Sequence, residues 1–370
     1  MRFILVSGIY YPDIGGPATY IPKLANFLVD RGDLIETLSL RDNSKVVLPS
    51  EPWRRHFVCR NLPKIIRQFV VIARLISLSQ RYQGILANGL HEEVAVSTLI
   101  TKKPAVAKVV GDPIWERFRN AQGSTISIKD FQNSKLPIPY KVQRKFLTWS
   151  LNRFQFVTTP SKELAEYIAS WGVKSEIRVI PNGVRCADAS PSRDNDLVSV
   201  VSVSRLVNWK NVDCLIRATS LANLKLVIVG SGPELNYLQD LANNLNANVE
   251  FTGDLERHEV TEKLRNADIY ALISDYEGLS FSLLEAMMMG KSILASDNRG
   301  NSDVITDEVN GIVVPVRSVQ DTFQALDRLL KDPHLRVTLS NNAHKEAIEK
   351  YCEENRLTEM RSVMMKSLGQ

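Results

Sequence analysis

The chain has 370 residues, of which 44% are hydrophobic and 24% are charged, with a formal net charge of +5. This length and composition favour two globular domains and exclude low-complexity or fibrous proteins. No apolar run reaches the roughly 18–20 residues that a membrane span requires, and the first strand-like run is too short for a secretory signal. Four cysteines far apart show no metal-type pairing, so we expect reduced thiols and a cytoplasmic location.

Charge is distributed unevenly along the chain. Residues 1–188 contain 27 Lys and Arg against 15 Asp and Glu, whereas the remainder contains 19 against 26. This asymmetry indicates that the N-terminal half meets an anionic partner. Nucleic acid and an anionic membrane surface are both candidates at this point.

Strand-like and helix-like segments alternate along most of the chain. In the first half, predicted strands cover 3–6, 35–40, 84–88, 105–110, 156–159 and 177–180, and predicted helices begin near residues 17, 64, 140 and 161. A second series begins at 197–203 and runs to 311–315, after a polar linker candidate at 188–196. Such alternation predicts an α/β protein with two Rossmann-like domains, and a ligand cleft between them.

The first predicted loop carries Gly15-Gly16-Pro17 before a helix. Glycines let a ligand approach the backbone closely, and proline suits a helix start. A turn that merely needs two glycines fits these residues equally well.

Two basic segments follow in the N-terminal half. Lys64 to Arg81 is a helix candidate in which Arg67, Arg74 and Arg81 recur every seventh residue and share one face. A solvated helix face is the favoured interpretation, and a membrane-facing basic helix is the alternative. The segment from Lys135 to Arg153 mixes cations with aromatic residues, as interfacial segments do.

In the second half, cations and glycines lie in the loops that directly follow predicted strands. Arg205 and Lys210 follow the first predicted strand of this half, in a loop before a helix. Gly230-Ser-Gly232 follows the next strand and is similar to a dinucleotide fingerprint, but Leu235 replaces the third glycine. The incomplete fingerprint argues against a nicotinamide oxidoreductase.

Two carboxylates, Glu277 and Glu285, flank the start of a predicted helix that ends at Gly290. Glu277 lies on the loop after a strand, where open α/β sheets bind ligands, and Glu285 is placed in the first helical turn. The carboxylates would accept from ligand hydroxyls, and the helix amides would hold phosphate. Alternatively, Ser282 and Glu285 have the spacing of a capping box, which would make Glu285 structural.

Taken together, these segments resemble retaining glycosyltransferases of the GT-B fold, especially glycosyltransferase family four. The resemblance rests on the E-x7-E spacing of Glu277 and Glu285, on Arg205 with Lys210, and on three further segments: Gly230-Ser-Gly-Pro-Glu-Leu235, Pro181-Asn-Gly-Val184 and the Gly-Asp and Trp-Glu pairs in 108–116. Gly111 and Asp112 stand where many relatives have a histidine, and His91 is a weak substitute. Arg299-Gly300 and Asp303 also depart from the family pattern.

The resemblance implies roles for individual residues. Arg205 and Lys210 would neutralise the donor diphosphate, Glu277 would hold sugar hydroxyls, and Glu285 would hold the ribose. The expected catalytic set is Arg205, Lys210, Glu277 and Asp112, and the expected donor-binding set is Gly16, Arg205, Lys210, Glu285, Leu279, Ser280 and Gly253. No metal and no cofactor are expected, since the nucleotide-diphosphate sugar is itself a substrate.

The family also implies an organisation and an activity. Residues 1–188 would form the acceptor domain, 189–352 the donor domain, and 353–370 a helix that packs back on the first. We expect transfer of a hexose to a glycan or lipid-linked glycan in bacterial surface polysaccharide synthesis, with an anionic membrane face as candidate partner and no nucleic acid. A non-catalytic nucleotide-sugar-binding module is the alternative.

Overall fold

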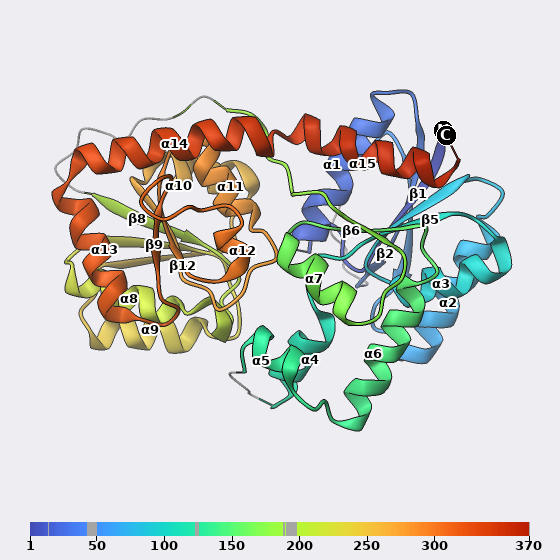
Figure 1. The fold of residues 1–370 in the computed structure, drawn as a ribbon, viewed down its shortest axis with the longest axis horizontal. Helices are drawn as coiled ribbons and strands as arrows, with labels where there is room; N and C mark the ends of the chain where they lie inside the picture. The colour runs from blue at the N-terminus through green and yellow to red at the C-terminus, as the bar shows by residue number, and fades with distance from the viewer. Residues whose placement is uncertain (14, 43–49, 123–125, 188, 190–197, 370) are drawn as a thin grey trace. The chain divides into compact units, whose positions relative to one another are not determined.

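The computed structural model describes residues 1–13, 15–42, 50–122, 126–187, 189 and 198–369 (Figure 1). The described residues form two compact units. Unit 1 comprises Met1–Pro181 and Glu354–Gln370, and unit 2 comprises Asn182–Glu353. The predicted linker at 188–196 lies outside the described residues, apart from Ala189.

Unit 1 is built on a parallel sheet. Its described part has seven strands in the order β3-β2-β1-β4-β5-β6-β7, and every neighbouring pair is parallel. The strands are β1 (Arg2–Ser7), β2 (Leu34–Arg41), β3 (Arg54–Cys59), β4 (Gly84–Asn88), β5 (Ala105–Lys108), β6 (Phe156–Thr159) and β7 (Glu176–Val179). The order reverses between β1 and β4, which is the switch point where such sheets bind ligands.

Helices connect these strands. They are α1 (Gly16–Val29), α2 (Lys64–Ser77), α3 (His91–Thr101), α4 (Pro113–Gln122), α5 (Ile128–Asn133), α6 (Ile138–Leu151) and α7 (Lys162–Ser170). Pro17 lies in the first turn of α1, as its fixed backbone angle favours. The last helix, α15 (Glu353–Ser367), carries Arg361, whose guanidinium pairs with the buried Asp33 at 2.7 Å.

Unit 2 repeats the plan. Within its described residues, six parallel strands lie in the order β10-β9-β8-β11-β12-β13. They are β8 (Ser199–Val203), β9 (Lys225–Val229), β10 (Val249–Gly253), β11 (Ile269–Leu272), β12 (Ser292–Ser296) and β13 (Ile312–Val314). The switch point here falls between β8 and β11. The central strands β11 and β12 are buried throughout, which explains their continuous apolar sequences.

The helices of unit 2 are η1 (Asn208–Lys210), α8 (Val212–Leu221), α9 (Leu235–Asn244), α10 (Arg257–Asn266), α11 (Phe281–Met288), α12 (Arg299–Ser302), α13 (Val319–Lys331) and α14 (Pro333–Tyr351). Helix α11 is followed by Gly290 at φ +65°, so the expected glycine stop is confirmed. None of the helices in the part of the chain described here combines the length and the apolar character needed to cross a membrane.

One strand, three helices and the end of one helix in unit 1 differ from the sequence prediction. Helices α3, α4 and α5 were not predicted. Strand β3 was not predicted, because Arg54–Cys59 lies at the sheet edge, is half-exposed and lacks an apolar pattern. Helix α2 ends at Ser77 rather than near Arg81. The chain then turns so that the hydroxyl of Tyr82 donates to the carbonyl of Leu75.

The cysteine prediction was wrong for one pair. Cys186 and Cys352, 166 residues apart in the sequence, form a disulfide with a Cα–Cα distance of 5.7 Å. The backbone brings them together, because Val184 pairs with Cys352 and accepts a hydrogen bond from the amide of Glu353. Sequence separation gave no signal of this pairing. Cys59 and Cys214 are free.

Candidate functional site

The predicted donor residues of unit 2 gather on the loops at its switch point. Arg205 and Lys210 follow β8, and Glu277 follows β11, the strand next to β8 in the sheet. The carboxyl ends of parallel neighbours meet at one sheet edge, so these three residues share that edge. Arg205 is exposed, whereas Glu277 is 7% exposed.

Lys210 and Glu277 are in direct contact. The Lys210 ammonium lies 2.5 Å from a carboxylate oxygen of Glu277, and the two residues are 67 positions apart. Isolated ion pairs on a surface stabilise a fold little, but a largely buried one must be held in place by its surroundings. The contact therefore supplies a charged pair of fixed geometry at the switch point.

The loop that carries Arg205 is held by the glycine segment after β9. A Cβ at Gly230 would lie 2.2 Å from the carbonyl oxygen of Ser204, and one at Gly232 would lie 2.2 Å from that of Leu206. The amide of Leu206 also donates to the carbonyl of Ser231 at 2.8 Å. The two glycines thus permit close packing of backbones.

Three residues around this loop were missed by the sequence analysis. Asp275 accepts two hydrogen bonds from Arg317, at 2.6 and 2.9 Å, and one from the side-chain amide of Asn211 at 2.6 Å. The backbone amide of Asp275 donates to the carbonyl of Trp209. Asp275 therefore fixes the η1 loop that carries Lys210. The sequence offered one signal for Asp275, namely an acidic residue two positions before Glu277. Such a residue is too common in loops to indicate a functional role.

Glu285 is bound to a side chain rather than to its own helix start. One carboxylate oxygen lies 2.5 Å from a guanidinium nitrogen of Arg257 on α10. The N-cap of α11 is Ser280, whose hydroxyl accepts from the amide of Leu283. Two expectations were therefore wrong: Glu285 is the fifth residue of α11, beyond the first turn, and Ser282 with Glu285 forms no capping box.

The other predicted donor residues of unit 2 border this edge. Leu279 is buried, and its backbone carbonyl accepts a hydrogen bond from the side-chain amide of Asn182 at 2.9 Å. This contact gives the Pro-Asn-Gly-Val turn a structural role in unit 2. Gly253 ends β10 with φ +68°, and its carbonyl accepts from the amide of Gly230. The donor-binding roles of Leu279, Ser280 and Gly253 stay predictions.

In unit 1, Gly16 is exposed at the start of α1, and Asp112 is wholly buried before α4. One oxygen of Asp112 accepts the first amides of α4, and the other accepts from Gln132 at 2.7 Å and Arg144 at 2.5 Å. Both oxygens are thus engaged by neighbours in the unit. This arrangement suits a residue that organises a loop, and the catalytic role of Asp112 stays a prediction.

His91 contacts backbone. Its Nε2 lies 3.2 Å from the carbonyl of Lys108 and 3.4 Å from the amide of Gly89. Burial lowers the pKa of His91, which favours the neutral ring. These contacts are those of a structural histidine at the start of α3.

The predicted stripe of basic residues on α2 is not a free face. Arg67 donates to the carbonyl of Arg60 at 2.7 Å, Arg74 lies 3.3 Å from a ring nitrogen of His56, and Arg81 lies beyond the helix. The outward face of α2 is apolar instead. Ile65, Ile66, Phe69 and Val70 on it are 40–69% exposed.

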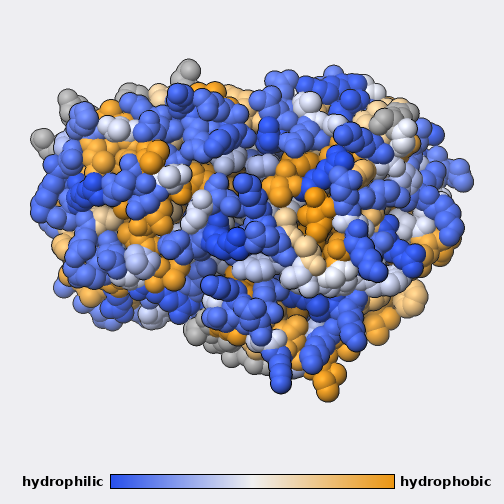
Figure 2. All heavy atoms as spheres, viewed as in Figure 1, coloured by the Kyte–Doolittle hydropathy of each residue, from blue (hydrophilic) through white to orange (hydrophobic). Residues whose placement is uncertain are grey.

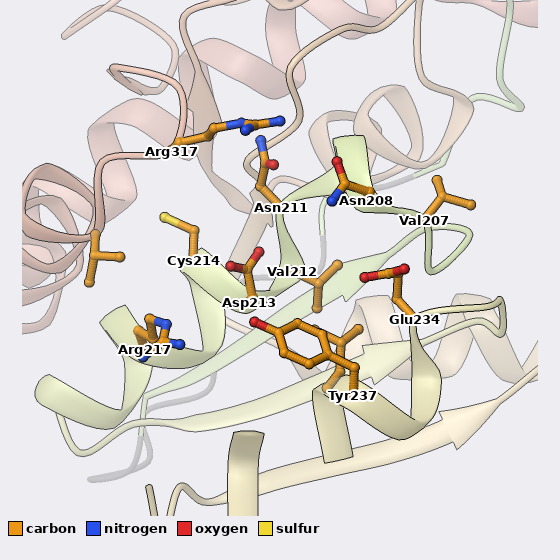
Figure 3. Close-up of a pocket in the computed structure, with 12 residues that line it drawn as sticks. Val207, Asn208, Asn211, Val212, Asp213, Cys214, Arg217, Glu234, Tyr237 and Arg317 are labelled. Atoms are coloured by element: carbon orange, nitrogen blue, oxygen red, sulfur yellow. The ribbon is translucent and has the colours of Figure 1, made fainter. Parts of the chain in front are cut away.

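A cavity of about 320 Å³ lies beside the donor residues of unit 2 (Figure 3). It opens between α8, α9 and the start of α13, and its lining includes Asn208, Asn211, Arg217, Tyr237 and Arg317. Arg205, Lys210, Glu277 and Glu285 do not line it. Its lining overlaps with the site at the η1 loop and at Arg317, which contact Asp275 or lie beside Lys210.

Known protein families match both halves of the chain. Residues 14–188 match "Glycosyltransferase Family 4", and residues 187–346 match "Glycosyl transferases group 1". The lipopolysaccharide core biosynthesis glycosyltransferase LpsD of Rhizobium meliloti is 30% identical over 344 residues, which is 90% of each chain. The chain belongs to glycosyltransferase family 4.

Other glycosyltransferases match over shorter stretches. An uncharacterized glycosyltransferase of Methanocaldococcus jannaschii is 31% identical over 54% of this chain, which spans 57% of that relative. A GDP-mannose-dependent mannosyltransferase of Corynebacterium glutamicum is 30% identical over 50% of this chain, which spans 55% of it. The chain therefore spans little more than half the length of these two relatives.

Solved structures confirm the predicted GT-B fold for this family 4 member. A crystal structure of Anabaena HepE in complex with UDP and glucose has a TM-score of 0.81, with 18% identity over 99% of this chain and all of that one. Sucrose-phosphate synthase from Thermosynechococcus elongatus has a TM-score of 0.82 at 18% identity, covering 99% of both chains. At this identity the likeness shows the fold alone.

Proposed function

We propose that this chain is a retaining glycosyltransferase that moves a hexose from a nucleotide-diphosphate sugar to a glycan or lipid-linked glycan. The proposal rests above all on Lys210 and Glu277, held in contact at the switch point of unit 2 on the same edge as Arg205. Breaking the donor bond releases a diphosphate, and preorganised cations stabilise the charge that grows on it. Family membership and the UDP complex of HepE support a nucleotide-sugar donor.

Each residue then has a stated task. Arg205 and Lys210 bind the diphosphate oxygens, Glu277 binds donor-sugar hydroxyls and orients Lys210, and Glu285 binds the ribose in place of its contact with Arg257. Gly16 lets the donor approach the backbone of unit 1. Asp112 positions the loop before α4 through its four hydrogen bonds. The leaving phosphate takes the proton of the acceptor hydroxyl, and no metal takes part.

The first test is a panel of nucleotide sugars. Only a true donor should raise the melting temperature, because a ligand that binds the folded state alone stabilises it. With that donor and a glycan acceptor, the product linkage should keep the donor's anomeric configuration, as measured by NMR coupling constants. An inverted linkage would contradict the retaining mechanism. Donor binding without any transfer to glycan or lipid-linked acceptors would favour the non-catalytic nucleotide-sugar-binding module.

The Glu285–Arg257 pair separates a binding role from a structural one. Glu285→Gln should weaken donor affinity roughly tenfold or more, because a hydrogen bond to a charged group contributes about 1.5–3 kcal/mol. The melting temperature should barely change, since Arg257 is half-exposed and such pairs contribute little to stability. Arg257→Gln, which breaks the same pair from the other side, is the control and should leave donor affinity within about threefold. If both variants lose stability and neither loses affinity, the pair is structural.

For the acceptor side, we propose peripheral contact of unit 1 with an anionic membrane surface. Helices α2, α3 and α6 lie side by side and carry exposed apolar residues. This apolar ridge comprises Ile65, Ile66, Phe69, Val70, Leu99, Ile100, Ile138, Val142 and Phe146, which are 39–78% exposed. Apolar side chains also reach the surface at the lower right of Figure 2, where Figure 1 places these helices.

The positive charge around the apolar ridge also suits an anionic membrane surface. Lys64, Lys102, Lys141 and Lys145 are exposed on the three helices or at their ends. Each cation near an anionic lipid surface contributes about 1 kcal/mol, and a fully buried large apolar side chain contributes about 1.5–3 kcal/mol. A ridge that combines both would hold the chain at the cytoplasmic face of a membrane.

Vesicle sedimentation tests the ridge. Ile66→Ser with Phe69→Ser should lower binding to anionic vesicles about tenfold or more, because two exposed apolar anchors are removed without loss of core packing. Arg74→Ser with Arg81→Ser, two exposed residues off the ridge, should change binding less than threefold. Binding of wild type should also weaken at 1 M salt, where the Debye length falls to about 3 Å. Equal binding of the Ile66/Phe69 variant and wild type would contradict the proposal.

A further inference from the structure

Four neighbouring strands of unit 1 carry polar residues at one level of the sheet, at or next to their carboxyl ends. Ser7 of β1 is in register with Asn88 of β4, and Lys108 of β5 is in register with Thr158 of β6. Asn88 and Lys108 continue the register of the preceding β4–β5 pairs. Neighbours in register point to the same face of a sheet. This polar row crosses the switch point between β1 and β4.

Two side chains of the polar row are buried without a hydrogen-bond partner in the described part of the chain. Lys108 is 1% exposed and Asn88 is 2% exposed. Among the described residues, the Lys108 ammonium and both polar atoms of the Asn88 amide have no hydrogen-bond partner. The ring of Tyr20 on α1 has its centroid 4.4 Å from Nζ of Lys108 and so packs against the cation. Ser7 and Thr158, by contrast, donate to backbone carbonyls.

Such an arrangement is costly unless a further group completes it. Nearly all buried polar groups in proteins are hydrogen-bonded, and a buried charge without a partner destabilises the fold. Burial lowers the pKa of Lys108 to about 7, so the amine changes charge near neutral pH. Strained or unpaired groups of this kind are retained mainly at functional sites.

Two glycines follow strands of the polar row. Gly8 follows Ser7, and a Cβ built at Gly8 would meet nothing within 4 Å. Gly89 follows Asn88 with φ +107°, and a Cβ there would lie 3.1 Å from the amide nitrogen of Gly8. The turns after β1 and β4 therefore approach closely while leaving open space over Gly8.

We propose that Lys108 and Asn88 form an oxyanion-binding subsite in unit 1, which takes a phosphate or carboxylate group of a ligand. An ammonium only donates hydrogen bonds, and the Asn88 amide nitrogen donates as well, so an acceptor-only group satisfies these two nitrogens but not the Asn88 amide oxygen. The oxyanion belongs either to a nucleotide diphosphate or to an acidic glycan. The subsite concerns binding alone, so it stands or falls independently of sugar transfer.

The test follows the Lys108 amine itself in the full chain labelled with ¹⁵N-lysine. The Nζ resonance is assigned by its loss in Lys108→Met and titrated at neutral pH with inorganic phosphate, UDP, glucuronate and glucose. Oxyanions should shift the resonance and raise the Lys108 pKa, because a nearby negative charge favours the ammonium, and uncharged glucose should not. A response to UDP and phosphate without glucuronate assigns the subsite to a nucleotide, and a response to glucuronate assigns it to an acidic glycan.

Variants separate a binding role from a structural one. Lys108→Met should weaken oxyanion binding roughly tenfold or more, since a charge-assisted hydrogen bond is lost. Its melting temperature should stay equal or rise, because a buried amine without a partner is removed. Lys129→Met, at an exposed position of α5, should change neither quantity. The subsite is refuted if no oxyanion alters the Lys108 resonance, or if Lys108→Met lowers the melting temperature and leaves phosphate affinity unchanged.

Discussion

Arg205→Ala and Lys210→Ala should each lower turnover by at least roughly a hundredfold, the usual scale for losing one preorganised charge-stabilising donor. Both residues lie on the loop after β8, and Lys210 contacts Glu277 at 2.5 Å. The loss should appear mainly in kcat, because the charge on the leaving diphosphate grows as the donor bond breaks. The loss in kcat is measured by steady-state kinetics with the donor that the nucleotide-sugar panel identifies.

The control for this pair is Arg265→Ala. Arg265 is an exposed cation of the same unit, near the end of α10 and away from the loop after β8. Its removal should leave kcat within about twofold, and this control and Arg205→Ala should melt within a few degrees of wild type. Lys210→Ala should melt lower, because it leaves the buried Glu277 carboxylate without its cation. Near-normal turnover of both loop variants would refute the donor-site assignment.

Gly300→Ala should lower turnover about a hundredfold, because it displaces Glu277. Gly300 itself is not among the residues proposed to bind the ligand. A Cβ at this position would lie 1.8 Å from the backbone carbonyl oxygen of Glu277. A backbone atom cannot rotate away, so the loop must shift, and a displacement of about 1 Å at a reacting group costs about a hundredfold. Overpacking should also lower the free energy of unfolding by about 1–3 kcal/mol.

Ser302→Ala on the same short helix is the matched control. Ser302 is exposed, and its hydroxyl donates only to Asp297 at 3.1 Å. This variant should keep turnover within about twofold and unfold like wild type. If Gly300→Ala lost stability but kept full turnover, the position of Glu277 would not matter for catalysis.

Much of the fold could be predicted from the sequence because its signals are local. Buried parallel strands such as β4 and β12 are continuous apolar runs, and Pro17 and Gly290 mark a helix start and a helix end through their own backbone preferences. Strand β3 has no such pattern. It lies at an edge, so its side chains are half-exposed and polar residues are tolerated.

The helix at Glu285 shows where local spacing misleads. Ser282 and Glu285 have capping-box spacing, yet the helix begins two residues earlier, with Ser280 as its cap. The hydroxyl of Ser282 instead donates to the carbonyl of Val203 on β8. It also shares a hydrogen bond with the hydroxyl of Tyr270 on β11. Contacts with strands distant in the sequence decided which serine capped the helix. Spacing alone could not distinguish two serines two residues apart.

The sequence by itself determined the α/β class, the family and which charged residues follow which strands, because these depend on short-range pattern and on motifs. Only the tertiary structure decided which of those residues meet. Lys210 with Glu277, Glu285 with Arg257, and the buried Lys108 beside Asn88 each join segments that the sheet order brings together. Pairing and burial depend on strand neighbours and packing across the fold, which are non-local, so no spacing along the chain encodes them.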